Sequence, residues 1–136
     1  MIPRLLLAAF LLAHGLVHLL FFSPPPPATA DGPTWPFALD RSWALTPLGM
    51  GADVTRVLGI ALIALTIAGF ALAAIVALGF LPASLWVPTV IIGAVASMAV
   101  LLVFYQPWLT LGLVIDVVLL WVVLVVDWTP GESPLS

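Results

Sequence analysis

The residues best able to do chemistry in this sequence are two histidines and one aspartate within long apolar stretches. His14 and His18 are four residues apart, which places both imidazoles on one face of a helix. Asp116 is the one acid inside an apolar stretch. Ionisable groups at mid-membrane cost about 2.5–3.5 kcal/mol on insertion scales, usually face the protein interior and are functional candidates by default. We therefore treat these three residues as the candidate site.

The composition predicts that membrane-spanning helices position them. The chain has 136 residues, of which 64% are hydrophobic and 7% charged, against roughly 45–50% and 25% in soluble domains. From Val57 to Ile115 there is no charged residue and no histidine. A net charge of −3 without lysine argues against nucleic acid as a partner, and the absence of cysteine excludes disulfides, thiolate catalysis and cysteine-ligated metals.

We expect one all-α domain, a bundle of four transmembrane helices. A span needs about 20 mostly apolar residues. Four stretches qualify, with one longer loop and a short tail: spans 3–22, 54–80, 86–105 and 109–128, loop 23–53 and tail 129–136. Amphipathic aromatic rings favour the membrane interfaces. They are expected in two sets: Phe21, Phe22, Tyr105 and Trp108 on one side, and Phe80, Trp86 and Trp128 on the other.

Two alternatives concern the first span. Arg4, the apolar run and Ala28-Thr29-Ala30 resemble a signal peptide, but the run of about 18 residues exceeds the usual 7–15. We therefore favour a retained span.

Positive charge is nearly balanced between the two sides of the membrane. We expect a multi-pass protein of the cell membrane with both termini in the cytoplasm, because the first helix often dominates orientation.

Depth along the helices predicts that the polar residues meet in one layer. A rise of 1.5 Å per residue puts His14 about 16 Å and His18 about 22 Å from the terminal side, with Asp116 between them at about 20 Å. By the same rise, Ser97 lies about 16 Å and Thr66 about 12 Å from the terminal side. Arg56, at the loop end of the second span, is long enough to reach inward, and Arg41 in the loop is a further candidate.

The loop and the small residues give two more predictions. The segment with Trp35, Phe37 and Trp43 is either an interfacial segment on lipid headgroups or a lid over the mouth of the bundle. Small residues four apart allow helices to approach closely in lipid. The predicted contact stripes are Ala9 with Ala13, Gly69 with Ala73 and Ala77, and Gly93 with Ser97.

The polar layer has three interpretations. It is a set of hydrogen bonds that fixes helix register, or a site for proton transfer, quinone or another small ligand, or a metal site of His14, His18 and Asp116. Haem is conceivable only in a dimer, because both imidazoles share one helix face. We predict no bound cofactor.

The stretches RLLLAAFLLAHGLVHLLFF from Arg4, WPFALDRSW from Trp35 and PWLTLGLVID from Pro107 resemble a group of small bacterial four-span proteins of uncharacterised activity. The first helix and the overall size are more distantly similar to DoxX-like membrane proteins, some of which are linked to quinone or thiol redox chemistry. DoxX-like first helices tend to carry a basic residue after the glycine, where His18 stands here. The second resemblance implies a redox or proton-coupled role.

The functional predictions follow from these observations. The sequence has no soluble catalytic domain, nucleotide motif or nucleophile–base arrangement, which favours a non-enzymatic accessory or self-associating membrane subunit. Its partners would be the lipid bilayer and a second copy or another membrane subunit. The first alternative is a DoxX-like redox or proton-coupled component that uses the His14, His18 and Asp116 layer. The second is a small transporter that works as a dimer, because four spans are few for an inverted-repeat transporter.

Overall fold

The computed structural model describes residues 1–27 and 35–130, and its regular structure is helical. Four helices in these residues are long and apolar enough to cross a membrane. Their α-helical parts are α1 (Ile2–Leu16), α2 (Ala52–Ala77), α3 (Trp86–Val103) and α4 (Thr110–Leu124). Short 3₁₀ helices adjoin or connect them: η1 (Val17–Phe22), η2 (Thr46–Leu48), η3 (Ala83–Leu85) and η4 (Pro107–Leu109). The predicted four-span architecture is confirmed. The Ala28-Thr29-Ala30 motif and the tail after Pro130 lie outside the described residues.

Local sequence explains where the second span ends. α2 stops at Ala77, three residues before the predicted end, because Gly79 adopts a left-handed conformation with φ of 84°. The amides of Gly79 and Phe80 then bond back to the carbonyls of Val76 and Ile75. This is the usual way in which a glycine closes a helix and satisfies its last carbonyls.

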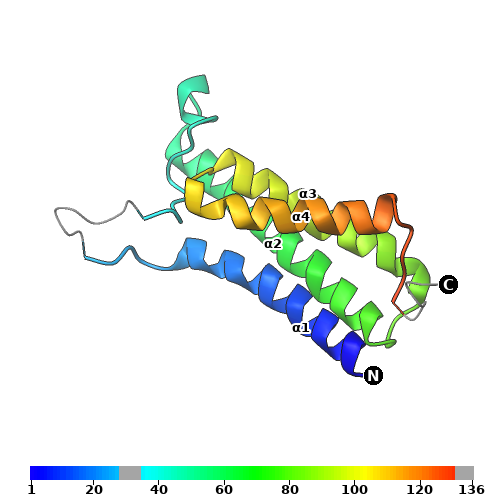
Figure 1. The fold of residues 1–136 in the computed structure, drawn as a ribbon. Helices are drawn as coiled ribbons and strands as arrows, with labels where there is room; N and C mark the ends of the chain where they lie inside the picture. Colours follow the sequence, from blue (N-terminus) through cyan, green and yellow to red (C-terminus); the bar gives the residue numbers. More distant parts are fainter. Residues whose placement is uncertain (28–34, 131–136) are drawn as a thin grey trace.

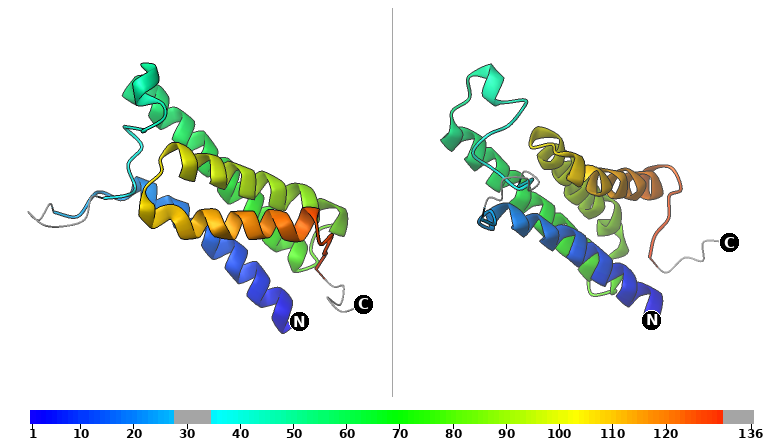
Figure 2. Two further views of the ribbon diagram at one scale, coloured as in Figure 1. Left: turned by 45° about the horizontal axis from the view of Figure 1, so that its top comes forward. Right: turned by 60° about the vertical axis from the view of Figure 1, so that its left-hand side comes forward.

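The helices run antiparallel in chain order, so both ends of the described chain lie at one end of the bundle and the loop before α2 lies at the other (Figure 1). α2 packs against both α1 and α3, and α4 packs against α3, whereas the backbones of α1 and α4 hardly approach each other. α1 and α4 diverge toward the terminal end of the bundle (Figure 2). The space between these two helices is bridged by side chains.

Two glycines set the closest helix crossing. A Cβ atom built on Gly69 of α2 would lie 2.4 Å from the backbone nitrogen of Gly93 in α3. Gly69, Ala73 and Ala77 are all buried, as the predicted stripe requires. The stripe Ala9 and Ala13 is wrong, since both residues are exposed.

α1 instead buries Ala8, Leu11, His14 and Gly15. The physical reason is the cost of leaving an imidazole in hydrocarbon, which turns the histidine face of the helix inward.

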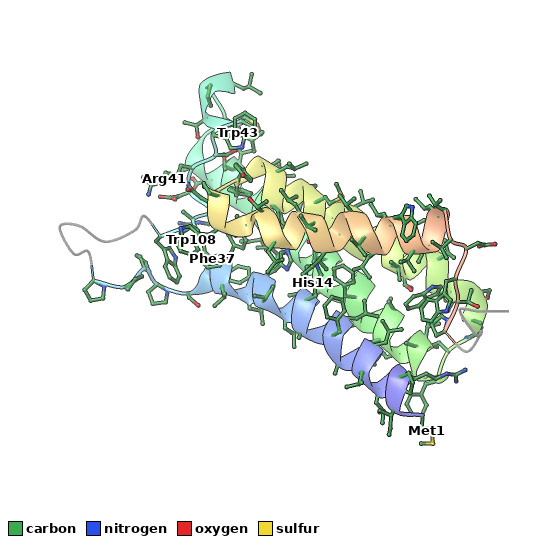
Figure 3. The ribbon with its side chains drawn as sticks, viewed as in Figure 1. Met1, His14, Phe37, Arg41, Trp43 and Trp108 are labelled. Carbon is green, nitrogen blue, oxygen red and sulfur yellow. The ribbon has the colours of Figure 1, made fainter. Side chains whose placement is uncertain are left out.

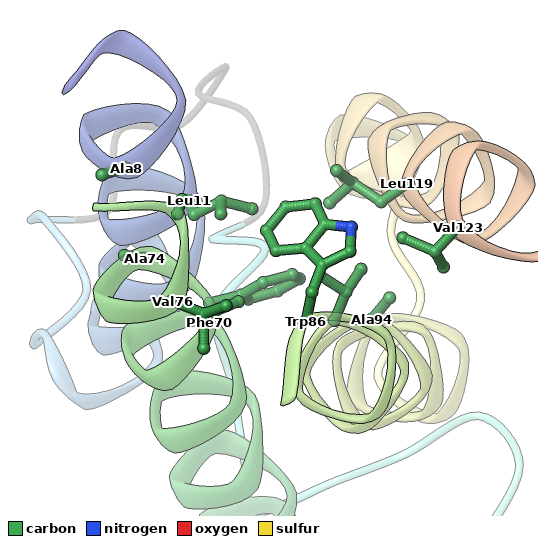
Figure 4. Packing of buried hydrophobic residues seen from close by; sticks show 12 residues of the cluster. Ala8, Leu11, Phe70, Ala74, Val76, Trp86, Ala94, Leu119 and Val123 are labelled. Carbon is green, nitrogen blue, oxygen red and sulfur yellow. The ribbon is translucent and has the colours of Figure 1, made fainter. Parts of the chain in front are cut away.

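Trp86 fills the centre of the larger apolar cluster. The residue is 1% exposed, and its ring lies between Leu11 of α1 and Leu119 of α4 (Figure 4). The indole N–H donates to the carbonyl of Trp128 over 2.9 Å. Trp86 therefore lies beside Trp128, with which it was grouped, but its side chain is buried within the bundle. The backbone carbonyl that follows α4 supplies the hydrogen-bond partner that this buried indole needs. Phe80 and Trp108 are exposed at opposite ends, as predicted.

Candidate functional site

Four buried polar side chains from α1, η1, α3 and α4 form one hydrogen-bonded network. Nε2 of His14 lies 2.8 Å from Oδ1 of Asp116, and Ser97 Oγ lies 2.5 Å from Oδ2 of the same carboxyl group. Ser97 Oγ is also 3.1 Å from Nε2 of His18. Asp116 and Ser97 are fully buried, and both histidines are nearly so. The structure therefore brings together His14, His18, Asp116 and Ser97. The hydrogen bonds run from His14 to Asp116, from Asp116 to Ser97 and from Ser97 to His18.

The end of α1 positions the second histidine. The chain tightens from α-helix to 3₁₀ helix at Val17, yet the two imidazoles stay adjacent, with ring centroids 5.9 Å apart and nearly perpendicular planes. His18 Nδ1 lies 3.1 Å from the carbonyl oxygen of His14, in the last turn of α1. Carbonyls in a last helical turn lack regular intrahelical partners. The side chain of His18 supplies one.

The contacts restrict where protons reside. A carbonyl only accepts, so His18 Nδ1 carries a hydrogen, while Ser97 has a single hydroxyl hydrogen to donate. In one neutral arrangement Asp116 is a carboxylate that accepts from Ser97, and a protonated His18 donates to the Ser97 oxygen. In the other, Asp116 is protonated and donates to Ser97, which donates to a neutral His18. His14 donates from Nε2 to Asp116 in both.

These two arrangements differ by one proton, which moves between Asp116 and His18 through the Ser97 hydroxyl. Each has zero net charge over the network, which suits a site in hydrocarbon, because an uncompensated charge there is costly. The network is therefore able to relay a proton without acquiring net charge.

A cavity of about 330 Å³ lies beside this network, between α1 and α4. Small-molecule sites occupy roughly 300–1,000 Å³ and combine apolar walls with a few polar groups. This cavity fits that description, because both histidines contribute to its wall and the rest of the wall is apolar or aromatic. The other lining residues are Phe10, Ala13, Val17, Phe21, Phe37, Leu101, Trp108, Leu109, Leu111, Gly112 and Ile115. No described residue hydrogen-bonds to Nδ1 of His14. That nitrogen is the part of the network available to a ligand.

The predicted lid divides into two parts. Phe37 lines the cavity and packs edge-to-face on Phe21, with ring centroids 5.2 Å apart, at the loop end of the bundle (Figure 3). Trp35 packs behind Phe37 at 5.3 Å. Trp43 is 66% exposed and donates from its indole nitrogen to the Leu102 carbonyl over 2.7 Å. Trp43 therefore packs on the outside of α3 and does not line the cavity beside the histidines.

Three other candidates do not join the network. Thr66 is fully buried, but its hydroxyl donates to Leu62 in its own helix over 2.9 Å. Arg56 and Arg41 are exposed at the loop end and make no contact with the histidines or Asp116. The expected inward reach of Arg56 is wrong. A guanidinium at the edge of a span remains in water more cheaply than it enters hydrocarbon.

The metal interpretation finds no support in residues 1–27 and 35–130, where no group of three or more histidine, aspartate or glutamate side chains is placed to hold an ion. Apart from Nδ1 of His14, the nitrogen and oxygen atoms of the proposed set are engaged in hydrogen bonds within the chain. His14 Nε2 and Asp116 contact each other directly, and both nitrogens of His18 have hydrogen-bond partners.

Sequence reasoning missed the cavity itself. Its walls are apolar residues in apolar spans, so residue type does not distinguish them from residues that face lipid. The available signal was the pair of small residues on facing walls, Ala13 of α1 and Gly112 of α4.

Comparison of the chain with protein-family models, curated proteins and solved structures found no match. The four apolar helices indicate a multi-pass protein in a lipid bilayer. Any more specific function has to be inferred from the geometry of the network and cavity.

Proposed function

We propose that this membrane protein binds a small lipid-soluble molecule with a hydroxyl or carbonyl group between α1 and α4, and exchanges a proton with it through His14. Quinones and quinols belong to this chemical class. The observation that supports the proposal is the placement of His14. His14 lines the cavity; its Nδ1 has no hydrogen-bond partner among the described residues, and its Nε2 is hydrogen-bonded to buried Asp116.

The chemistry follows from the tautomer of His14. Because Nε2 donates to Asp116, a neutral His14 presents a lone pair at Nδ1, which accepts a hydrogen bond from a ligand hydroxyl. If that hydroxyl proton transfers, the O–H bond breaks, an Nδ1–H bond forms and the electron pair remains on the ligand oxygen. In the arrangement with Asp116 as a carboxylate and His18 protonated, the Nε2 proton moves in concert to Oδ1 of Asp116. His14 stays neutral, and a protonated His18 balances the ligand anion.

The remaining cavity wall suits a ring or short chain rather than a polar metabolite. Apolar side chains surround the two imidazoles, and Phe37 lines the loop end. α4 exposes much of its surface, including Leu111 at the cavity and Val114. A ligand dissolved in the bilayer could therefore enter between α1 and α4 without crossing water.

Binding of decylubiquinol to the purified protein in lipid nanodiscs tests this function. We expect saturable binding, measured by tryptophan fluorescence quenching, that weakens roughly tenfold in His14→Phe, because that variant keeps a flat ring and removes both nitrogens. Thr66→Val is the matched control. It removes a buried polar group at similar depth that makes no contact with the network, and its affinity should be unchanged. Equal affinity of His14→Phe and the parent protein would exclude the proposed site.

A second candidate function is a non-enzymatic accessory or self-associating bundle in which the network only fixes helix register. It is favoured by the near-complete pairing of the network within the chain, where His14 Nδ1 is the one nitrogen without a partner among the described residues. Here His14→Phe should lower stability or alter assembly, and decylubiquinol should partition into the nanodisc without saturation.

A further inference from the structure

A second cavity lies at the loop end of the bundle, and the side chains that line it are rich in hydrogen-bond donors. Its volume is about 580 Å³. It is formed by the loop before α2 and by the connection between α3 and α4: Trp35, Pro36, Ala38, Arg41, Ser42, Trp43, Thr46, Pro47, Phe104, Tyr105 and Gln106. No aspartate or glutamate is among these lining residues. The charge of the cavity wall is therefore set by Arg41.

Trp35, whose side chain lines this cavity, carries an unsatisfied donor. Its indole nitrogen is buried and has no hydrogen-bond partner in the described part of the chain. An indole N–H can only donate, and buried donors in folded proteins nearly always have a partner. The neighbouring donors are already engaged, since Trp43 donates to Leu102 and the Ser42 hydroxyl donates to Val103.

Arg41 is the second available donor. Among the described residues it forms no ion pair, and although Asp40 precedes it in the chain, Asp40 does not line the cavity. A guanidinium offers several N–H groups in a fixed fork that matches the oxygens of a phosphate. Gln106, on the opposite wall, adds an amide N–H. The group that these donors fit is acceptor-rich and negatively charged.

We propose that this loop cavity binds a phosphate group through Arg41 and Trp35. Figure 3 shows Arg41 and Trp43 at the loop end, beyond the apolar spans. Exposed aromatic residues at such a level mark the depth of lipid headgroups. The same chemistry is offered by an anionic lipid headgroup and by free phosphate. The site is separate from the cavity beside His14, so it does not depend on the function proposed above.

Titration calorimetry of the full chain in neutral detergent tests this site with three probes: dihexanoyl phosphatidylglycerol, dihexanoyl phosphatidylcholine and inorganic phosphate. We expect saturable binding of phosphatidylglycerol that weakens about tenfold or more in Arg41→Gln, which removes a charged hydrogen bond. Trp35→Phe removes only the indole N–H from a similar ring and should weaken binding about three- to tenfold. Arg56→Gln is the matched control, because it removes the same charge from an exposed position outside the cavity.

The outcomes separate the sources of the phosphate. Binding of phosphatidylglycerol without inorganic phosphate assigns the site to a lipid headgroup, and comparable binding of inorganic phosphate assigns it to the free ion. Equal affinity for phosphatidylcholine shows that the site recognises the phosphate rather than the net charge of the lipid. The proposal is overturned if none of the probes saturates, or if Arg56→Gln weakens binding as much as Arg41→Gln does.

Discussion

Replacing Asp116 with asparagine should preserve the fold, whereas replacing it with alanine should destabilise the protein by about 2–4 kcal/mol. An asparagine oxygen can accept from His14 Nε2, and its amide N–H can donate to Ser97, which then donates to His18. Asp116→Asn therefore reproduces the hydrogen bonds of the protonated carboxyl group. Alanine instead leaves His14 and Ser97 buried without their 2.8 Å and 2.5 Å partners.

Unfolding free energies in lipid bilayers, measured for the parent and both variants, test this prediction. The asparagine variant should be within about 1 kcal/mol of the parent protein, because it keeps three of the pairings in the network. It should also fail to exchange a proton, since an amide does not titrate. If both variants lose the same stability, the charge of the carboxylate rather than its hydrogen bonds holds the helices together, and the arrangement with a protonated Asp116 is wrong.

Gly69→Ala should destabilise the bundle by about 1–3 kcal/mol. The added Cβ would lie 2.4 Å from the nitrogen and 2.6 Å from the Cα of Gly93. These are backbone atoms, so the contact is relieved only if α2 and α3 move apart. Ser97 is one turn beyond Gly93 on α3, and the same movement should displace it from the network and weaken decylubiquinol binding.

Two other glycines provide controls for Gly69→Ala. The free energy of unfolding in lipid bilayers is to be measured for all three variants. A Cβ on Gly51 meets nothing within 4 Å, so Gly51→Ala should cost less than about 1 kcal/mol, through the N-cap preference of α2 alone. A Cβ on Gly112 meets only the end of the Leu101 side chain at 2.8 Å, which can rotate away, so Gly112→Ala should cost less than Gly69→Ala. Equal losses at Gly69 and Gly112 would contradict the assignment of the α2–α3 crossing as the tightest contact.

The fold was largely predictable because the bilayer imposes strong constraints on sequence. In hydrocarbon, a helix makes all of its backbone hydrogen bonds within one segment. The length of each apolar stretch therefore predicted the number of spans and their approximate bounds. The rotation of each helix was harder to predict. Ala9 and Ala13 have the right spacing for a contact stripe but are exposed, because the neighbouring histidines determine which side of α1 is buried.

The candidate site was predictable where depth alone decided the contacts. Residue counting from the two membrane faces brought Asp116 level with the histidines and Ser97, and the structure joins these four residues. It failed for Thr66, because depth says nothing about whether a hydroxyl bonds to its own helix. It also gave no indication of the cavities, which depend on the separation of α1 from α4 and on the path of the loop.

Solid-state NMR of the protein in lipid bilayers, with ¹⁵N in histidine and ¹³C in the aspartate carboxyl groups, measures the contact on which the proposed function depends. We expect a through-space coupling between one carboxyl carbon and Nε2 of His14, lost in Asp116→Asn, together with a protonated Nδ1 in His18. If no aspartate carboxyl carbon couples to either imidazole, Asp116 is not joined to His14, and the proton relay proposed for this site does not exist.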